Sequence, residues 1–439
     1  MNQFTASLWG DEAFSTILAM KSPMEIIEIV SRDTSPPLHP ILLHYWMQVF
    51  GTSEVAIRAM SFTFYLLTVL VVFVIGKHLW NTKTGIISAI LSAVNPILFA
   101  YAFEGRMYSL LLFTSVLSTY FFLTNKKWAH SLATAAALYT HHFSLLVIGI
   151  QGLWAIIQAT IDFIRKKDYF FRSYWNQLWP FVLAFLIYLP WLPILYQQTR
   201  MVTSGFWLGK PTFPELLGLY TTFIIGPNPT RIFIGGLGLV LSILILRRWQ
   251  IRKKRDIYCI MWFLLPIFLI WLLSQFAQSI FFDRYMLAMI PGATLLLASR
   301  HRGKYSFIIL SIFIAILGWS SYNYFTHPTR RPFRELADYI KSTRQPGDFL
   351  INWNTTAHHI WEMKYYQIPA PIYTGGETQL PFYVGTALMQ AGDVINKLPD
   401  APRLGVIFSG DPGEQIINGY QKTSQKHFED LTLQWWMKI

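Results

Sequence analysis

The chain has 439 residues, of which 53% are hydrophobic, 17% aromatic and only 13% charged, a composition that excludes an ordinary soluble enzyme. The net charge of +13 does not indicate nucleic acid, because residues 330–439 carry 11 basic and 11 acidic side chains. The whole excess lies in the apolar residues 1–329, as is typical of membrane topology. The single cysteine can form no disulfide within the chain, and no signal peptide is visible.

Residues 1–54 precede the first predicted span. Apolar side chains at helical spacing over residues 12–29, with acids between them, predict a helix lying in the membrane interface. Pro36 and Pro37 end this pattern, because proline cannot continue a helix interior. Residues 41–50 predict a second short amphipathic helix. The alternative is a solvated leader, which the density of aromatic residues disfavours.

The following residues, 55–329, are predicted to be a mainly α, polytopic membrane helix bundle. Runs of about 20 apolar residues match the thickness of the hydrocarbon core. The ten expected spans are 55–78, 84–101, 106–124, 128–143, 145–164, 177–197, 231–248, 257–276, 285–299 and 305–325.

Basic residues gather in five alternate loops of this bundle, at residues 77–83, 126–127, 165–172, 247–255 and 300–304. The positive-inside rule makes these loops cytoplasmic. We therefore expect an integral protein of a bacterial-type plasma membrane, with its active site and C-terminal domain on the extracytoplasmic side. The acids that this topology places outside are Asp11, Glu12, Glu25, Glu28, Asp33, Glu54, Glu104, Glu215 and Asp283.

Ten spans place both termini outside, which is unusual for a chain without a signal. We expect either a helix missing before Met1 or translocation of the N-terminus with the first hairpin.

Two further outer segments are predicted. Residues 198–230 form a long loop, and loops of this length are usually functional lids or disordered. Residues 330–439 are predicted to form a small extramembrane α/β domain. Its helices are expected at 334–342 and 384–398 and its strands at 347–352 and 403–410. The turn SGDPGE lacks the glycine spacing of a phosphate loop.

The adjacent acids Asp11 and Glu12, in LWGDEAF, are the first candidate site. A carboxylate can accept the proton of an incoming hydroxyl, and burial beside lipid raises its pKa toward useful values. The alternative is a helix cap, because the macrodipole stabilises an acid at a helix N-terminus. Both interpretations remain open for the pair.

Two arginines at outer helix ends are the second candidate. Arg106 lies in AFEGRMYSL with Glu104 and Tyr108, and Arg284 lies in FFDRYMLAMIP after Asp283. A guanidinium binds phosphate in a fork, so the two together predict a site for an anionic headgroup. The alternatives are an internal Glu–Arg pair or headgroup snorkelling.

The adjacent His141 and His142 face different sides of a helix, which favours interfacial hydrogen bonding over metal binding. Lys210 could reach a phosphate from the second outer loop. No ligand cluster has a convincing spacing for a metal ion, so no cofactor is assigned, and dependence on a divalent metal is left open.

The ordered motifs LWGDEAF, DTSPPLHPILLHYWMQVFG, SEVAIRAM, NPILFAYAFEGRMYSL, LYTHHF, FFDRYMLAMIP and RPFRELADYIKSTRQPGD resemble bacterial members of glycosyltransferase family 39. These are type C, polyprenyl-phosphate-sugar-dependent enzymes related to protein O-mannosyltransferases and lipid A aminoarabinose transferases. The resemblance covers about residues 7–350.

The resemblance implies a sugar donor on a polyprenyl phosphate and inversion at the anomeric carbon. It implies that Asp11 is the general base and that Glu12 orients it or holds the acceptor. Arg106 and Arg284 match positions expected near the lipid phosphate, with Glu104, Tyr108, Lys210 and Asp283 completing the substrate-binding set. Asp33, His39 and His142 are expected to support the acceptor or the outer loops.

Two departures from the family pattern bear on this assignment. Many relatives have histidine before the double proline, whereas this chain has Ser35, with His39 out of register. Relatives also have a transmembrane helix before the acidic pair, where this chain has ten residues.

We therefore expect a membrane glycosyltransferase that moves one mannose-like or other hexose or pentose to an acceptor on the exoplasmic face. The partners are the lipid-linked donor, membrane lipids and an acceptor that is a protein, glycan or lipid; nucleic acid is not expected. The alternatives are a lipid-linked-sugar flippase or other polytopic transporter, and a non-catalytic lipid-binding protein. Transporters tend to carry ionisable groups at midspan and internal repeats, whereas the midspan segments here hold almost no charge and show no repeat. The sugar, the acceptor and the oligomeric state are not specified by the sequence.

Overall fold

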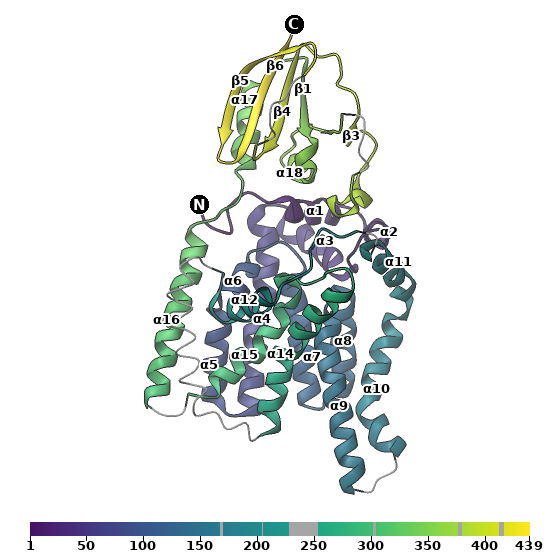
Figure 1. Cartoon of the computed structure of the whole chain (residues 1–439), viewed down its shortest axis with the longest axis vertical. Coiled ribbons are helices and arrows are strands. Elements are labelled where there is room, and N and C mark those ends of the chain that lie inside the picture. Colours follow the sequence, from purple (N-terminus) through teal and green to yellow (C-terminus); the bar gives the residue numbers. More distant parts are fainter. Residues whose placement is uncertain (167–169, 204, 228–252, 302–303, 376–379, 412–416) are drawn as a thin grey trace. The chain divides into compact units, whose positions relative to one another are not determined.

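The computed structural model describes the chain except for residues 167–169, 204, 228–252, 302–303, 376–379 and 412–416 (Figure 1). Its contacts divide the chain into two compact units. The sheet unit comprises residues 1–33, 40–57 and 327–439, and the helix unit comprises residues 34–39 and 58–326. Each unit is described separately.

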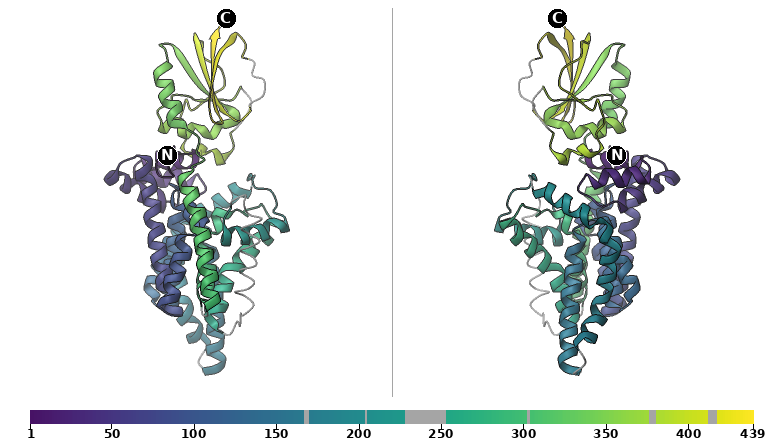
Figure 2. Two further views of the ribbon diagram at one scale, coloured as in Figure 1. Left: turned by 90° about the vertical axis from the view of Figure 1, so that its left-hand side faces the viewer. Right: turned by 90° about the vertical axis from the view of Figure 1, so that its right-hand side faces the viewer.

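Long helices make up most of the helix unit and lie side by side in both views of Figure 2. In chain order they are α4 (Glu54–Leu79, which begins in the sheet unit), α5 (Thr82–Ala93), α6 (Pro96–Ala102), α7 (Tyr108–Leu123), α8 (Lys127–Thr140), α9 (Ser144–Lys166), α10 (Phe170–Tyr188), η1 (Leu189–Trp191), α11 (Leu192–Thr203), α12 (Phe213–Ile225), α14 (Lys254–Phe276), η2 (Asp283–Met289), α15 (Ile290–Ala298) and α16 (Lys304–Thr326).

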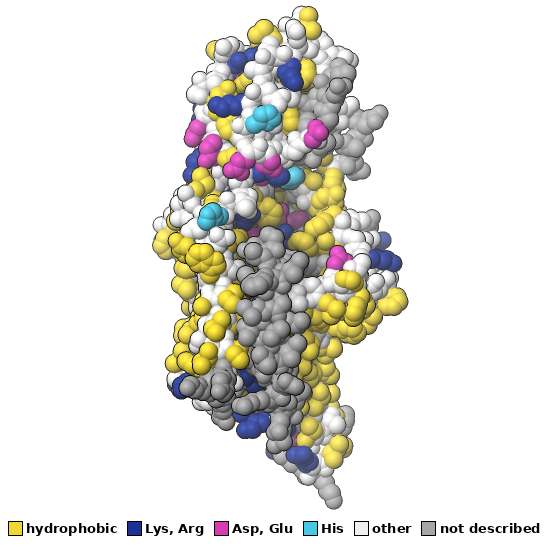
Figure 3. Space-filling model, turned by 60° about the vertical axis from the view of Figure 1, so that its left-hand side comes forward, with side chains coloured by type: hydrophobic (Ala, Val, Ile, Leu, Met, Phe, Trp, Pro, Cys, Tyr) yellow, Lys and Arg dark blue, Asp and Glu magenta, His cyan; other side chains and the backbone are white. Residues whose placement is uncertain are grey.

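Within the described residues, five helices are long and apolar enough to cross a membrane, or six if the bent pair α5–α6 is one span. The unbroken ones are α4, α9, the α10–α11 stretch, α14 and α16. Hydrophobic side chains stay exposed along them, for example Leu70, Phe185, Leu273 and Trp319, as lipid-facing surfaces require. Figure 3 shows such side chains along the unit, with Lys and Arg gathered toward its lower end.

The expected ten spans are therefore confirmed only in part. Helices occupy 106–124 and 128–143, but α7 and α8 have 16 and 14 residues, fewer than a bilayer crossing needs. The segment 285–299 is divided between η2 and the nine-residue α15. The predicted span 231–248 lies outside the described residues.

A sharp bend separates α5 from α6, which the sequence had suggested to be one span. The side chain of Asn95 caps α6 by accepting hydrogen bonds from the backbone N–H groups of Ile97 and Leu98, both at 3.1 Å, and Pro96 occupies the first turn. The two helices diverge by 63°. Asn95 also donates to the carbonyl of Phe223 at 2.8 Å, which fixes the bend against α12.

Polar side chains join α7, α8 and α9 inside the bundle. Ser118 lies 2.8 Å from the Thr134 hydroxyl, and Gln151 accepts from Ser118 at 3.2 Å, donates to Thr119 at 3.0 Å and lies 2.9 Å from His130 Nε2. Because hydrocarbon offers no hydrogen bonds, such groups hold helices together when they satisfy one another.

The sheet unit is built on a six-stranded sheet of order β3-β2-β1-β4-β6-β5. Strands β1 to β4 are parallel neighbours, and β6 and β5 are antiparallel. The strands are β1 (Asp348–Trp353), β2 (Ile372–Tyr373), β3 (Val394–Ile395), β4 (Arg403–Ser409), β5 (Tyr420–Phe428) and β6 (Leu431–Lys438). The helices are α1 (Gly10–Ala19), α2 (Pro23–Ser31), α3 (Leu38–Phe50), α17 (Phe333–Thr343) and α18 (Ile360–Tyr365), with η3 (Asn354–His359), η4 (Phe382–Val384) and η5 (Thr386–Leu388).

Alternate side chains of β1, β4 and β6 point to opposite faces of this sheet. Leu350, Ile407 and Leu433 pack with α17, which covers one face (Figure 2), while Ile351 and Val406 pack in a cluster on the other. The helix expected at 334–342 and the strands at 347–352 and 403–410 are thus present.

Two predictions in this unit were wrong: one helix is divided in two, and another is absent. The pattern at 12–29 divides into α1 and α2, because Ser22 caps a new helix that Pro23 begins. Residues 384–398 form η5 and β3 instead of a helix. Gly385 and Gly392 there have φ of +88° and +92°, a left-handed conformation that interrupts a helix.

The N-terminal residues are tied to the rest of the sheet unit by hydrogen bonds. The hydroxyl of Tyr366 accepts from the N–H of Leu8 at 2.9 Å and donates to Glu54 at 2.9 Å. Arg334 donates to the same Glu54 carboxylate at 2.5 Å and to the carbonyl of Thr5 at 3.1 Å.

Close packing of α4 on α5 depends on two glycines. A Cβ on Gly85 would lie 2.6 Å from the carbonyl oxygen of Phe73, and one on Gly76 would lie 2.8 Å from the Cα of Gly85. We expect Gly85→Ala to separate the two helices and to cost about 1–3 kcal/mol, seen as a lower midpoint of thermal unfolding in detergent. The matched control is Gly149→Ala on α9, where nothing lies within 4 Å of the new methyl group. Equal midpoints for the two variants would contradict the packing assignment.

Candidate functional site

The acidic pair occupies the first turn of α1, and its two members are placed differently. Glu12 is fully buried, and its carboxylate accepts the backbone N–H of Trp9 at 3.4 Å. Glu12 is thus the residue that caps the helix. Asp11 is half-buried in the same turn, where the helix dipole favours negative charge. Glu12 therefore fits the capping interpretation, the dipole of the same turn stabilises Asp11, and the proton-accepting role stays a prediction.

Helix α1 packs on α18 within the sheet unit. The rings of Phe14 and Trp361 meet edge to face with centroids 5.1 Å apart. A Cβ on Gly10 would lie 3.4 Å from Glu362 Oε2, so a larger residue would press on that carboxyl group. Glu362 and its neighbours His358 and His359 were not singled out from the sequence, because nothing in their spacing shows that they face α1.

In the helix unit, Arg284 lies among aromatic rings at the start of η2. Its guanidinium donates to the hydroxyl of Tyr108 at 3.4 Å and lies 4.6 Å from the ring centre of Phe282. The neighbouring Asp283 accepts the backbone N–H of Arg284 at 2.6 Å and the hydroxyl of Tyr101 at 3.4 Å. Aromatic faces hold the guanidinium by cation–π attraction.

Arg106 lies in the short turn between α6 and α7, in the same unit. Its backbone N–H donates to the carbonyl of Glu104 at 2.7 Å, and Ser61 of α4 donates to its carbonyl at 3.5 Å. The side chains of Arg106 and Arg284 both lie within electrostatic range of His141. Residues far apart in the sequence thus converge, and we call Tyr101, Glu104, Arg106, Tyr108, Asp283 and Arg284 the arginine cluster.

His39 also lies close to this cluster. Burial, assisted by the positive charge of Arg106, lowers the pKa of His39 to about 3, so the imidazole is neutral at physiological pH. Its Nε2 is buried and has no hydrogen-bond partner among the residues that the structure describes. A buried nitrogen in this condition can bond to a polar ligand.

The second outer loop also reaches the arginine cluster through aromatic contacts. Trp207 packs edge to face on Phe282, with centroids 5.2 Å apart. Gln275 and Gln278 of α14 hold the loop by donating to the carbonyls of Pro211 at 2.7 Å and Phe206 at 3.1 Å. His142 Nε2 lies 2.9 Å from Gln198 of α11. The turns before α7 and η2, the turn after α8 and the second outer loop therefore meet at one end of the helix unit.

The remaining predicted residues are divided between the two units. Lys210 is exposed in the second outer loop, and Asp33 lies in the turn that follows α2, where its N–H donates to the carbonyl of Val30 at 3.2 Å. Asp11 and Glu12 belong to the sheet unit, whereas Glu104, Arg106, Tyr108, Asp283, Arg284, His39 and His142 belong to the helix unit.

The basic loops meet at the opposite ends of these helices. Arg255 donates to the carbonyl of Leu79 and lies over the ring of Trp80, and Arg300 pairs with Asp256 at 3.3 Å.

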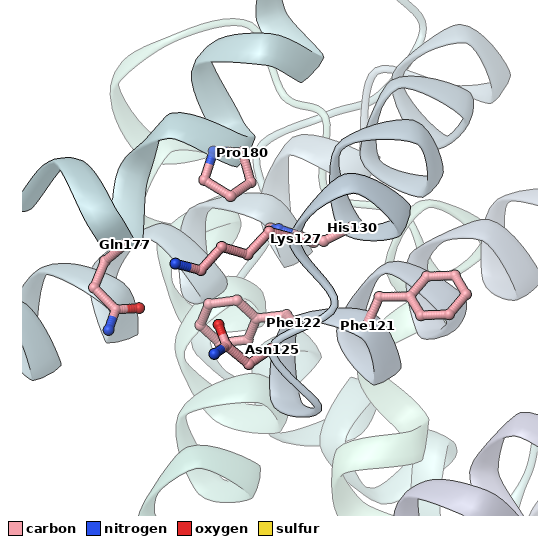
Figure 4. A pocket seen from close by; sticks show the side chains of 7 residues that line it. All are labelled: Phe121, Phe122, Asn125, Lys127, His130, Gln177 and Pro180. Carbon is pink, nitrogen blue, oxygen red and sulfur yellow. The ribbon is translucent and has the colours of Figure 1, made fainter.

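A small cavity between α7, α8 and α10 is lined by Phe121, Phe122, Asn125, Lys127, His130, Gln177 and Pro180 (Figure 4). It contains none of the predicted site residues, and Lys127 donates to Asn176 beside it. No group of three or more metal-ligating side chains occurs in the described ranges.

A family model described as dolichyl-phosphate-mannose-protein mannosyltransferase matches residues 34–196. The matched range contains SPPLHP, AFEGRMYSL and LYTHHF, three of the motifs that carry the resemblance. No curated protein sequence matches the chain.

Solved structures extend the comparison to nearly the whole chain. ArnT from Cupriavidus metallidurans in the apo state is similar with 12% identity, a TM-score of 0.51 and coverage of 98% of this chain and 94% of that chain. The same protein bound to undecaprenyl phosphate matches with 12% identity, the same coverage and a TM-score of 0.47. The apo oligosaccharyltransferase of Archaeoglobus fulgidus matches with 12% identity and a TM-score of 0.38, over 78% of this chain and 55% of that chain.

The chain thus has an ArnT-like fold, and its apolar helices make it an integral membrane protein. The resemblance to glycosyltransferase family 39 that the sequence motifs predicted is confirmed.

Proposed function

We propose that this protein is a membrane glycosyltransferase that moves one sugar from a polyprenyl-phosphate donor to an acceptor on the exoplasmic face, with inversion. The observation that carries the proposal is the arginine cluster. Its two arginines and two tyrosines come from α6, α7, the turn between these helices and η2, and they gather at one end of apolar helices. A lipid-linked phosphate reaches such a site from the bilayer, because its chain stays in hydrocarbon while its charge stays at the interface.

In the proposed reaction an acceptor hydroxyl attacks the anomeric carbon as the bond from that carbon to the phosphate oxygen breaks. The lipid phosphate leaves with the electron pair and gains negative charge. Arg106 and Arg284 lower the barrier to the extent that their contact with phosphate strengthens in the transition state. The neutral His39 supplies a hydrogen-bond partner near Arg106 without adding a second cation.

Asp11 is the proposed general base, taking the proton of the acceptor hydroxyl as the new bond forms. Its neighbour Glu12 is fully buried and accepts the N–H of Trp9, whereas Asp11 is half-buried and thus more accessible to an acceptor. The family description supports a mannose-like sugar and a protein acceptor, and both are part of the proposal.

The base assignment predicts a large loss of rate with little loss of donor binding. We expect Asp11→Asn to lower transfer from radiolabelled polyprenyl-phosphate sugars to an acceptor extract by about a hundredfold or more, because general-base catalysis contributes about 10²–10⁴. The matched control is Glu28→Gln, an exposed acid of α2 paired with Arg32. An Asp11→Asn variant that transfers sugar at the wild-type rate would refute the base role. A wild-type protein that moves the intact lipid-linked sugar across the membrane without transferring the sugar would favour a flippase.

The phosphate assignment predicts a selective loss of donor affinity. We expect Arg106→Ala and Arg284→Ala each to weaken binding of undecaprenyl phosphate about 10- to 100-fold, because a charged hydrogen bond contributes about 1.5–3 kcal/mol. Binding of the uncharged polyprenol should not change, and Arg200→Ala on α11 is the matched control. Unchanged phosphate affinity in both variants, measured in nanodiscs, would remove the cluster from the donor site.

The proposed orientation has its own test, made simple by the single buried cysteine. In a Cys259→Ala background, Lys210→Cys should react with a membrane-impermeant maleimide in intact cells, and Lys253→Cys should react only after permeabilisation. The reverse pattern would place the arginine cluster on the cytoplasmic side and overturn the proposed topology.

A further inference from the structure

Glu362 lies on α18, in the contact between this helix and α1. It carries a buried carboxyl group that the proposed reaction does not use. The residue is 1% exposed, and its Oε2 has no hydrogen-bond partner within the described ranges. Its Oε1 lies 3.4 Å from His359 Nδ1. A carboxylate in such a setting is costly, because neither water nor a full set of donors solvates it.

The carboxyl group lies against the N-terminal end of α1. The position of a Cβ on Gly10 is 3.4 Å from Glu362 Oε2 and 3.6 Å from Oε1. The next residue along α1 is Asp11, and its charge acts on both Glu362 and His358. The packing of Phe14 on Trp361 fixes the two helices at this distance.

The groups that face Glu362 do not neutralise it. From η3 come His358 and His359, and burial lowers the pKa of these imidazoles to about 4 and about 3, so both are uncharged at neutral pH. His359 Nε2 also lies 2.9 Å from the hydroxyl of Ser409. Arg331, before α17, acts on Glu362 but pairs with Asp430 at 2.7 Å.

Burial is the main reason that the pKa of Glu362 rises from its ordinary 4.5 to about 8, and the charge of Asp11 adds to it. His358 and Arg331 act in the opposite sense without reversing the shift. Glu362 is thus protonated at neutral pH and ionises above about pH 8.

We propose that Glu362 is a positioning residue for Asp11, whose neutral carboxyl group lets the first turn of α1 pack on α18 and so holds the proposed base in place. The proposal rests on the role of Asp11 in sugar transfer. Ionisation of Glu362 puts a second negative charge beside Asp11 in a dry contact, which repels α1 and displaces the base.

The sign of the pH dependence follows from the direction of the shift. The pKa of Glu362 is higher in the folded protein than the ordinary glutamate value of 4.5 that applies to the unfolded chain. Its contribution to the stability of the folded protein is therefore complete below pH 4.5 and is lost as the pH rises through about 8. The two histidines have lowered pKa values, so their contribution changes below pH 6.5. Between pH 6.5 and 9, Glu362 therefore dominates the titration of this contact.

Transfer rates measured from pH 6 to pH 9.5 test the proposal. Wild-type transfer should fall about fivefold between pH 8 and pH 9, following the protonated fraction of a group whose pKa is about 8. Glu362→Gln is neutral and of the same size, so it should keep its pH 7 rate within about twofold at pH 9. Glu335→Gln, which removes an exposed carboxylate from α17, should retain the wild-type profile. An unchanged alkaline fall in Glu362→Gln would overturn the positioning role.

Hydrogen exchange provides a readout that needs no transfer activity. In the wild-type protein, amides of α1 should lose protection relative to those of α17 with a midpoint near pH 8, and Glu362→Gln should abolish the difference. Equal protection of the two helices up to pH 9.5 would refute the coupling, even if the variant failed to fold. Loss of α1 protection in a protein with no transferase activity would retain the Glu362 switch and reject the proposed reaction.

Discussion

Charge beside lipid must be paired, stacked or kept at the membrane interface, and this constraint organises the helix unit. Its apolar helices keep cations at their ends. At one end Arg284 lies over Phe282 and bonds to Tyr108, and at the other Arg255 lies over Trp80 and Arg300 pairs with Asp256.

The acidic pair shows how a helix terminus can separate two chemically similar groups. Glu12 is buried, and its carboxylate accepts a hydrogen bond from the N–H of Trp9, which fixes the first turn. Asp11 is half-buried one residue earlier, in a turn that Gly10 allows to approach Glu362. The N-terminal residues are in turn held by Tyr366 and Arg334, both of which bond to Glu54. Precise placement of a base requires such supporting contacts, because small displacements are costly in rate.

Several local features of the fold do not follow from hydrophobic periodicity alone. Periodicity over residues 12–29 does not reveal that Ser22 and Pro23 start a new helix. Helical propensity over 384–398 is overridden by two glycines with positive φ, and Gly385 lies so close to Phe14 that an added Cβ would be 2.7 Å from its ring. Helix α7 is too short to be counted as a full crossing, and its hydroxyl-bearing Thr114, Ser118 and Thr119 are buried among other helices.

By itself, the sequence determined the membrane character, the alternation of basic loops, the strands at 347–352 and 403–410 and the family resemblance. These follow from local composition and spacing, which need no knowledge of distant contacts. Tertiary structure decided the rest. Only folding brings Tyr101, Tyr108 and Arg284 together, buries Glu362 beside α1 and leaves His39 Nε2 without a partner in the described ranges. Burial and charge are properties of a side chain's neighbours in space, so they cannot be read from its neighbours in sequence.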